Sequence, residues 1–185
     1  MRVIGGEFRS RRLKALPGNA VRPTPDRLRE ALFNVLAPRL EGRTFLDAYA
    51  GSGAVGIEAL SRGAARAVFL ERHRPAALLI EQNLASIGAR SRALVVCAPA
   101  LKHLERVAAD IVFLDPPYNL EREYRQALAK LGANPPGLVI VQHDVRLELK
   151  EAYGSLVRTR SLRQGDNALT FFEPASACRR SGSPE

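Results

Sequence analysis

The sequence contains little of what a metal site or a disulfide framework requires. It has two cysteines and three histidines in 185 residues. Cys97 lies in an apolar run, Cys178 lies in a polar tail, and neither is at a metal-ligand spacing. His73, His103 and His143 fall in separate segments, where solvated or strand-end positions are expected. We therefore expect no metal, no disulfide and a reducing compartment.

Long apolar runs are also missing. A membrane-spanning helix needs about 20 consecutive apolar residues, and no run approaches that length. The opening residues, MRVIGG, lack the apolar core of a signal peptide, so we expect a cytoplasmic protein. With 46% hydrophobic and 25% charged residues, the composition predicts one compact domain that folds by burial alone.

Negative charge is scarce at one end of the chain. The formal net charge is +9 and the isoelectric point is about 10.4. Residues 1–43 hold ten basic and four acidic side chains, which amounts to +6 of that excess. This distribution favours a polyanionic partner such as a nucleic acid. The alternative is a basic face that is merely solvated.

The first 43 residues are predicted to form a small extension. Apolar and basic positions alternate over residues 1–16 around Gly5-Gly6, which indicates a β-hairpin. A Pro/Gly-rich stretch, residues 17–25, then leads into a helix capped by Thr24 or Asp26. One face of this helix carries Leu28, Ala31, Leu32, Val35 and Leu36. Arg27 and Arg29 lie off that face.

From residue 44 onward, apolar strands alternate with helical segments. The strands are expected at 44–48, 67–71, 93–97, 111–115 and 138–142, and the helices at 54–62, 75–87 and 124–131. Short Val/Leu/Ile/Phe runs of this kind are typical of a parallel sheet covered on both faces, so a doubly wound α/β fold is predicted. Phe33, Phe45, Phe69 and Phe113 fit core positions. Residues 153–162 and 168–173 predict a terminal hairpin, which ends the domain of residues 44–173, and residues 174–185 a flexible tail.

A glycine-rich turn follows the first strand, in Asp47-Ala48-Tyr49-Ala50-Gly51-Ser52-Gly53. Glycines let a ligand approach the backbone, and the next helix presents free N–H groups. Gly51, Gly53 and Gly56, with Glu71 about 20 residues on, also satisfy the dinucleotide pattern. A nicotinamide-dependent oxidoreductase is therefore one interpretation, and a plain βα turn is another.

Asp47 favours a different ligand. A carboxylate at this strand end would repel a pyrophosphate but attract the cationic amino-acid end of S-adenosylmethionine. Glu71, at the end of the next strand, could accept both ribose hydroxyls of an adenosine in either interpretation.

Asp115-Pro116-Pro117-Tyr118 follows the fourth strand, at the carboxyl edge where α/β folds bind ligands. An exocyclic amine on a base is a poor nucleophile because its lone pair is delocalised. The Asp115 carboxylate and a backbone carbonyl of the Pro116-Pro117 step could accept its two hydrogens and restore the lone pair, while Tyr118 stacks on a flipped base. By itself the motif could also be a surface turn. Together with Asp47 and Glu71, it predicts methyl transfer from S-adenosylmethionine to a base amine.

With these residues placed, the sequence resembles the RsmD-type family of bacterial 16S rRNA (guanine-N2)-methyltransferases, from about Arg2 to Glu173. Residues 22–34, RPTPDRLREALFN, are similar to the family's R-P-T-x-D-[RK]-x-[RK]-E-A-L-F-[ND]. Residues 46–60, LDAYAGSGAVGIEAL, are similar to its L-D-x-[FY]-A-G-[ST]-G-x-[LV]-G-x-E-A-L.

The resemblance implies a seven-stranded class I, Rossmann-like methyltransferase sheet, S-adenosylmethionine as donor and S-adenosylhomocysteine as product. It implies 16S rRNA in an assembling small subunit as partner, with guanine 966 as the family's target. We also expect a monomer. The expected cofactor-binding residues are Asp47, Tyr49, Ala50, Gly51, Ser52, Gly53, Glu71, Arg72, Cys97 and Ala98. The expected RNA-binding residues are Arg2, Arg9, Arg11, Arg12, Lys14, Arg22, Thr24 and Arg27. Ion pairing of Arg22, Arg27 and Arg29 with Asp26 or Glu30 on the helix surface is the alternative.

The chain departs from the family at Pro99, where Asp or Asn usually offers an acceptor to the adenine amine. Proline has neither a side-chain acceptor nor a backbone N–H. Either backbone groups of Cys97 and Ala98 substitute or the cofactor binds more weakly.

Four rival functions remain. An adenine-N6 methyltransferase would use the same Asp-Pro-Pro-Tyr chemistry, although no gap in the sequence could hold a DNA-recognition domain. A protein-glutamine methyltransferase is associated with Asn at position 115. An oxidoreductase would leave Asp47 and Asp115 unexplained, and a non-catalytic RNA-binding module would explain only the charge.

Overall fold

Eight strands form a single sheet in the computed structural model, which describes residues 1–15, 25–117 and 120–178. The strand order is β3-β2-β1-β4-β5-β8-β7-β6. The strands are β1 (Thr44–Asp47), β2 (Arg66–Leu70), β3 (Ala93–Val96), β4 (Ile111–Leu114), β5 (Leu138–Asp144), β6 (Ala152–Tyr153), β7 (Leu156–Gln164) and β8 (Asn167–Pro174). Strands β1 to β5 are parallel to one another, and the β5–β8, β8–β7 and β7–β6 pairs are antiparallel. This is the Rossmann-like methyltransferase fold, so the predicted fold class is confirmed.

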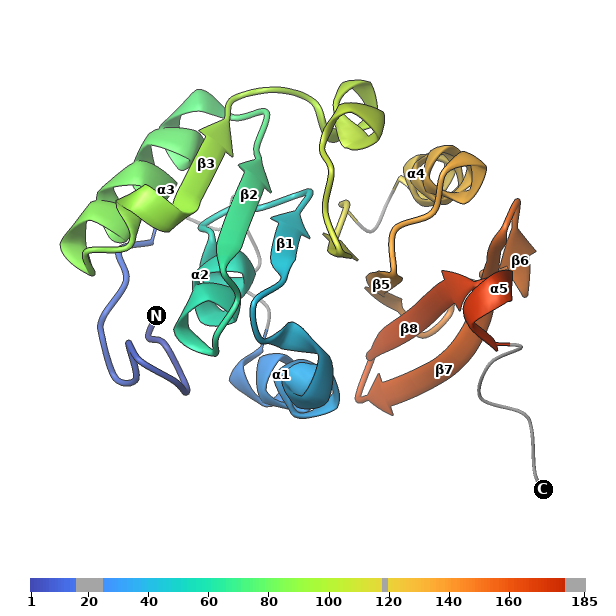
Figure 1. Ribbon diagram of the computed structural model, residues 1–185, viewed down its shortest axis with the longest axis horizontal. Helices are drawn as coiled ribbons and strands as arrows, with labels where there is room; N and C mark the ends of the chain where they lie inside the picture. Colours follow the sequence, from blue (N-terminus) through green and yellow to red (C-terminus); the bar gives the residue numbers. More distant parts are fainter. Residues whose placement is uncertain (16–24, 118–119, 179–185) are drawn as a thin grey trace.

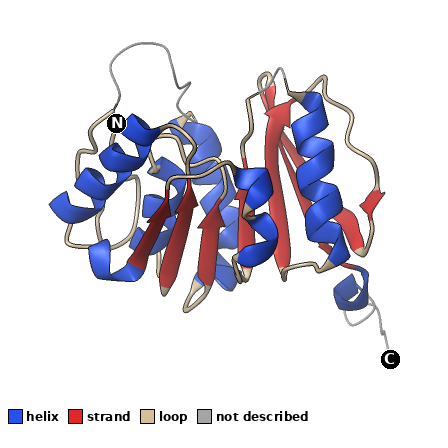
Figure 2. Ribbon diagram, turned by 90° about the horizontal axis from the view of Figure 1, so that it is seen from above, coloured by secondary structure: helices blue, strands red, loops and turns tan. Residues whose placement is uncertain are grey.

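Helices cover both faces of the sheet (Figures 1 and 2). The helices are α1 (Asp26–Leu40), α2 (Ala54–Ser61), α3 (Arg74–Ser86), α4 (Glu121–Ala133) and α5 (Ala175–Cys178), with 3-10 turns η1 (Arg90–Arg92), η2 (Ala100–Lys102) and η3 (Leu104–Arg106). Side chains alternate across each strand. On β1, Phe45 packs in the cluster of α1 and α2, whereas Leu46 packs in the cluster of α4. The doubly wound arrangement therefore follows from apolar residues at consecutive strand positions.

The sheet has one strand more than the seven that were expected. The additional strand, β6, has two residues, and it pairs with the start of β7 through Ala152 and Tyr153. Such a short segment has no alternating pattern to reveal it. Otherwise the predicted strands, helices and terminal hairpin are confirmed with bounds that shift by a few residues. Figure 1 shows this hairpin, β7 and β8, at the opposite end of the sheet from β3.

The N-terminal segment, residues 1–15, is a short, irregular form of the β-hairpin predicted. Arg2 and Arg12 make an antiparallel bridge, and the N–H groups of Val3 and Leu13 donate to the carbonyls of Arg11 and Met1, both at 3.0 Å. Apolar side chains also hold the segment: Val3, Phe8 and Leu13 are buried in a cluster with residues of α2 and α3. Figure 1 shows this trace lying against those two helices. The segment is therefore packed into the domain.

Helix α1 differs from its prediction at two points. No side chain caps it: Pro25 is the N-cap residue, the Asp26 carboxylate accepts a hydrogen bond from Arg29, and Thr24 lies outside the described residues. Arg29, expected off the buried face, is 1% exposed. A charged side chain is buried only when it finds partners. Those of Arg29 include carboxylates on two helices.

The start of the predicted tail is ordered. Ala175–Cys178 form the short helix α5, and the N–H of Ala175 donates to the carbonyl of Ser155 at 2.9 Å. Among the helices that the structure describes, none combines the length and the apolar character needed to cross a membrane.

Candidate active site

The residues expected to carry the chemistry follow the ends of four adjacent strands. In the register of the sheet, Asp47 at the end of β1 lies opposite Phe69 of β2 and Phe113 of β4. Glu71 and Asp115 each come two residues after those partners. Because neighbouring strands lie about 4.8 Å apart, these carboxylates belong to one edge, which β3 extends.

Hydrogen bonds beyond the strand ends keep this edge together. The N–H of Ala50 donates to the carbonyl of Leu70 at 3.1 Å, and that of Ala98 donates to the carbonyl of Glu71 at 3.0 Å. The glycine-rich turn and the residues after β3 are thereby fixed to the end of β2. The turn needs left-handed backbone at Gly51 (φ 54°) and Gly53 (φ 78°), which glycine adopts without steric cost.

Both oxygens of Glu71 bond to backbone N–H groups. Oε2 accepts from Gly51 at 2.8 Å, and Oε1 accepts from His73 at 2.7 Å. The carboxylate therefore shapes the glycine-rich turn, a role that its strand-end position alone did not indicate. Each oxygen has a second lone pair, so acceptor capacity remains for a ligand.

Asp47 is a buried carboxylate, 2% exposed, that accepts a hydrogen bond from the N–H of Gly56 in the first turn of α2 at 3.0 Å. Burial raises the pKa of Asp47 to about 7, assisted by the charge of Glu71 and opposed by the Gly56 hydrogen bond. Asp47 and Glu71 lie close enough for the charge of one to raise the pKa of the other. A cation bound between them would relieve this repulsion, so the site favours a cation. These carboxylate acceptors fit the ammonium end of S-adenosylmethionine.

Tyr49 and Arg72 each come two residues after the end of a strand, β1 and β2 respectively. Tyr49 is half-buried, and burial, followed by the charge of Glu123 on α4, raises the pKa of its hydroxyl, whereas the charge of Arg72 lowers it. The hydroxyl stays neutral at all ordinary pH values. Arg72 is exposed, and its carbonyl oxygen accepts the thiol of exposed Cys97 with a separation of 3.9 Å.

Pro99 follows the end of β3 in an exposed position and begins the 3-10 turn η2. Its carbonyl accepts the N–H of Lys102 at 3.2 Å. The N–H of Ala98 is already used by Glu71. An adenine ring bound here would thus find no free backbone N–H group at positions 98 and 99.

The carbonyls of the Asp-Pro-Pro turn are fixed from two sides. The hydroxyl of Tyr124 on α4, fully buried, donates to the carbonyl oxygen of Pro116 at 2.8 Å. The N–H of Leu120 donates to the carbonyl of Pro117 at 3.0 Å. Tyr118, the expected stacking residue, lies outside the described residues. Sequence reasoning missed Tyr124, since an aromatic residue on an apolar helical face is expected to be core.

The basic residues assigned to RNA are on the surface wherever the structure describes them. The exposed side chains are Arg2, Arg9, Arg11, Arg12, Lys14 and Arg27. Arg22 and Thr24 lie outside the described residues. Arg29, by contrast, is buried.

Three buried polar side chains that the sequence reasoning did not assign hold the N-terminal segment. Glu58 and Ser61 lie on α2 and Asn83 on α3, each at most 3% exposed. Glu58 accepts the N–H groups of residues 4 and 5, both at 2.8 Å. Their positions on otherwise apolar helices were the available signal, since a polar group is buried there only with partners.

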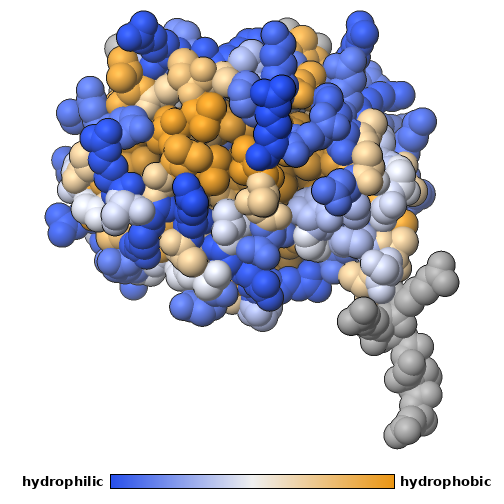
Figure 3. Space-filling view, turned by 45° about the horizontal axis from the view of Figure 1, so that its top comes forward, coloured by the Kyte–Doolittle hydropathy of each residue, from blue (hydrophilic) through white to orange (hydrophobic). Residues whose placement is uncertain are grey.

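Figure 3 turns the top of Figure 1, toward which β1, β2 and β3 point, by 45° toward the viewer. It shows an apolar area bordered by hydrophilic side chains.

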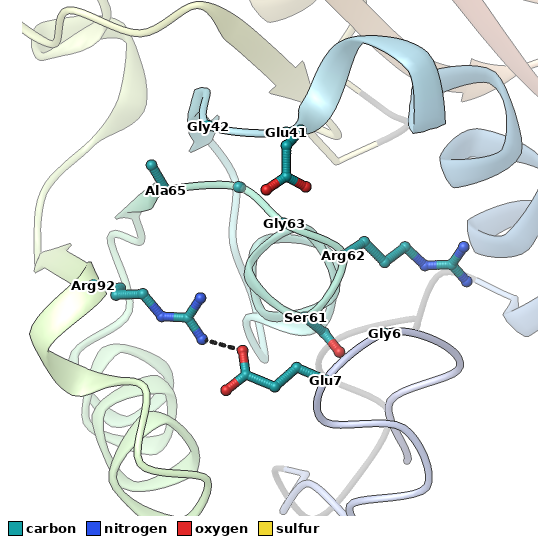
Figure 4. A pocket seen from close by; sticks show the side chains of 10 residues that line it. Gly6, Glu7, Glu41, Gly42, Ser61, Arg62, Gly63, Ala65 and Arg92 are labelled. Atoms are coloured by element: carbon teal, nitrogen blue, oxygen red, sulfur yellow. Dashed lines mark hydrogen bonds and ion pairs between the residues drawn. The ribbon is translucent and has the colours of Figure 1, made fainter.

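A separate hollow of about 590 Å³ opens at the opposite edge of the sheet (Figure 4). Its charged lining residues are Glu7, Glu41, Arg62 and Arg92, and Arg92 pairs with Glu7 at 2.7 Å. The described residues that line it include none of the candidate site residues. Within residues 1–15, 25–117 and 120–178, no three His, Cys, Asp or Glu side chains come together in a way that could hold a metal ion.

Comparisons with known proteins place the chain in a sequence family. The family described as Conserved hypothetical protein 95 matches residues 1–173. The chain is 35% identical over 182 residues to YlbH of Bacillus subtilis, provisionally named an rRNA methyltransferase, covering 94% of this chain and 98% of that one. It is 37% identical over 151 residues to ribosomal RNA small subunit methyltransferase D of Haemophilus influenzae, covering 77% and 78% of the two chains.

Solved structures share the fold. The Escherichia coli protein yhhF, provisionally named a methyltransferase, superposes with a TM-score of 0.83 at 35% identity, covering 94% of this chain and 97% of that chain. An RNA methyltransferase from Salinibacter ruber in complex with S-adenosylhomocysteine superposes with a TM-score of 0.65 at 16% identity, covering 83% of this chain and 94% of that one. At that identity the likeness extends to the fold alone.

Proposed function

Because the chain belongs to the family described as Conserved hypothetical protein 95, the RsmD-type family, we propose that it methylates the exocyclic N2 amine of a guanine in 16S rRNA. The donor is S-adenosylmethionine and the product S-adenosylhomocysteine. The substrate is the rRNA of an assembling small subunit, and the protein acts as a monomer in the cytoplasm. Its relatives' names support rRNA as the substrate, and the Salinibacter complex supports the cofactor.

The observation that carries this proposal is the succession of strand ends at one edge. Ala98 and Glu71 follow β3 and β2, Asp47 ends β1, and Asp115 follows β4. These four strands are adjacent in that order. The first three residues surround a nucleoside with an ammonium group, and the fourth faces the acceptor base. When bound, the cofactor supplies an electrophilic methyl group on a sulfonium.

The residues of this chain prepare the acceptor nitrogen. The Asp115 carboxylate and the Pro116 carbonyl accept the two amine hydrogens, which draws the lone pair out of the ring. With the cofactor bound, that lone pair would attack its methyl carbon, and S-adenosylhomocysteine would leave with the electrons of the carbon–sulfur bond. The nitrogen then gives up its extra proton to Asp115. Alignment of nitrogen, carbon and sulfur provides the remaining acceleration.

The experiment is a methyl-transfer assay with labelled S-adenosylmethionine and three acceptors: naked rRNA, small subunits and DNA. Nuclease digestion identifies the labelled nucleoside, and an Asp115→Ala variant serves as the inactive control. We expect N2-methylguanosine from 16S rRNA. Label on adenine or in DNA would overturn the proposal, as would hydride transfer to a nicotinamide without methyl transfer.

A further inference from the structure

Asn83 on α3 joins the N-terminal segment to the glycine-rich turn. Its side chain is 1% exposed. Oδ1 accepts the N–H of Lys14 at 2.8 Å, and Nδ2 donates to the carbonyl oxygens of Lys14 at 3.1 Å and of Ser52 at 3.4 Å. A carboxamide carries two N–H donors, so it can serve both carbonyls at once. One buried side chain thus holds the backbone of a basic segment and the backbone of the candidate cofactor loop.

Other contacts join the same two parts. The hydroxyl of Ser52 donates to the sulfur of Met1 at 3.6 Å. Ala50, in the turn, is buried in the same apolar cluster as Val3 and Leu13 of the segment. The turn therefore packs against the segment along both of its arms.

The middle of the segment, where the chain turns back, is held at another place. The N–H of Phe8 donates to the Ser61 hydroxyl at 2.9 Å, and that of Glu7 donates to the Ser61 carbonyl at 2.7 Å. Ser61 ends α2, at the edge of the sheet opposite the glycine-rich turn. Figure 4 shows Gly6 and Glu7 beside Ser61 at this edge. The segment therefore has two anchors: a loop anchor at Lys14 and a distal anchor at Phe8.

We propose that Asn83 is a positioning residue that couples the docking of Lys14 to the shape of the glycine-rich turn, so that the N-terminal segment forms part of the cofactor site. The proposal rests on the function proposed above, because it assigns the turn to S-adenosylmethionine. A ligand that orders the turn also fixes the Ser52 carbonyl against Asn83, and through it the Lys14 backbone. Such coupling is reciprocal: docking of the segment strengthens cofactor binding by the same factor.

The direct test is amide hydrogen exchange of the unmodified protein with and without S-adenosylhomocysteine. The ligand slows exchange of the Lys14 amide, by about tenfold if one hydrogen bond of ordinary strength is reinforced. The Phe8 amide at the distal anchor is the internal control and keeps its rate. Equal rates at Lys14 with and without bound ligand would overturn the coupling.

Substitution supplies a second test. Asn83→Asp keeps the acceptor for the Lys14 N–H but loses both donors. It is expected to raise KM for S-adenosylmethionine about tenfold and leave kcat at saturation unchanged. Gln82→Ala is the matched control, because the Gln82 oxygen accepts the Lys14 ammonium at 3.4 Å without contacting the turn; its KM stays at the original value.

The outcomes separate the two proposals. If the unmodified chain binds no S-adenosylhomocysteine, the proposed function fails. If it binds the ligand but Lys14 exchange does not change, the coupling alone is wrong, whatever the Asn83→Asp variant does to KM. Should Asn83→Asp not fold, the exchange experiment decides by itself.

Discussion

The guanidinium of Arg29 on α1 and the carboxylate of Glu58 on α2 form a buried pair, 3.9 Å apart from Nε to Oε2, with side chains 1% and 0% exposed. Arg29 also donates from Nη2 to the carbonyl of Arg2 at 2.7 Å. Burial lowers the pKa of Arg29, although the charges of Glu58 and Asp26 act in the opposite direction. Since Glu58 also bonds to the backbone of residues 4 and 5, the pair fixes the N-terminal segment to two helices.

Arg29→Ala is expected to lower the free energy of unfolding by about 1 to 3 kcal/mol, because it removes the donor to the Arg2 carbonyl and one of two cations beside Glu58, which keeps Arg62 at 2.7 Å. Urea denaturation measures this change. Arg27→Ala is the matched control two residues away. Arg27 is exposed, so its removal is expected to change stability by less than about 0.5 kcal/mol. Equal stabilities for the two variants would show that the pair contributes nothing.

Arg29 also shows why part of the fold could not be predicted. The helical face was assigned from its apolar residues, and an arginine between them was placed in solvent. Its buried partner Glu58 is 29 positions along the chain, a distance that no local pattern covers. The missing cap has a local cause, since the N-cap residue is Pro25, whose side chain has no hydrogen-bond acceptor. In contrast, strand β4 was predictable because it is a continuous run of four apolar residues. All four are buried in the structure.

The candidate site, like the fold, was predictable only in part. Parallel strands end at one edge of a sheet. Residues at the ends of adjacent strands, such as Asp47 and Asp115, are therefore neighbours however the loops fold. The contacts that fix those loops depend on tertiary packing. The Tyr124 hydroxyl on α4 donates to the carbonyl of Pro116. The Glu71 carboxylate accepts the backbone N–H groups of Gly51 and His73.

Asp47 predicts a pH dependence of stability. Its pKa is raised from 3.8 to about 7 in the folded protein, so the folded state holds this proton more tightly than the unfolded state. The contribution to stability is complete below pH 3.8 and is lost as the pH rises to about 7. Urea denaturation of the cofactor-free protein across this range measures it. Asp47→Asn has no such proton and is expected to remove this component of the pH dependence.

Cofactor affinity is expected to have the opposite dependence. An ammonium group favours ionised Asp47, so binding of S-adenosylhomocysteine tightens as the pH rises through about 7. Calorimetry at pH values below 7, in two buffers with different ionisation enthalpies, measures the proton that binding releases. Affinity that does not change with pH would mean that Asp47 does not face the ammonium group.

Tyr124→Phe tests whether the buried hydroxyl positions the Pro116 carbonyl. We expect kcat to fall about tenfold, as for the loss of one hydrogen bond that holds an acceptor in place, with KM for the cofactor unchanged. Tyr153→Phe is the control: its buried hydroxyl accepts the N–H of Lys150 at 3.1 Å, in the same core cluster. If both variants lose only stability and keep kcat, the Tyr124 bond is structural alone.

Arg11→Ala tests the proposed RNA surface. Each phosphate contact contributes about 1 to the slope of the logarithm of RNA affinity against the logarithm of salt concentration, so this variant should lower the slope by about that amount. Arg122→Ala is the matched control, because Arg122 is exposed on α4, which covers the other face of the sheet. Binding assays at several salt concentrations measure both. Equal slopes for the two variants would remove Arg11 from the RNA surface.

Pro99 predicts that this chain recognises adenine weakly. No side-chain acceptor exists at that position, and the N–H of Ala98 is already bonded to Glu71. Pro99→Asp supplies an acceptor at a backbone φ of −63° that aspartate adopts freely, so affinity for S-adenosylhomocysteine should rise by about tenfold. Pro99→Ala, which restores the N–H without an acceptor, separates the two deficits. An analogue lacking the adenine amine should gain nothing from Pro99→Asp, because the new carboxylate has no donor to bind. If natural ligand and analogue respond alike, the carboxylate acts through the loop and the adenine amine is bound elsewhere.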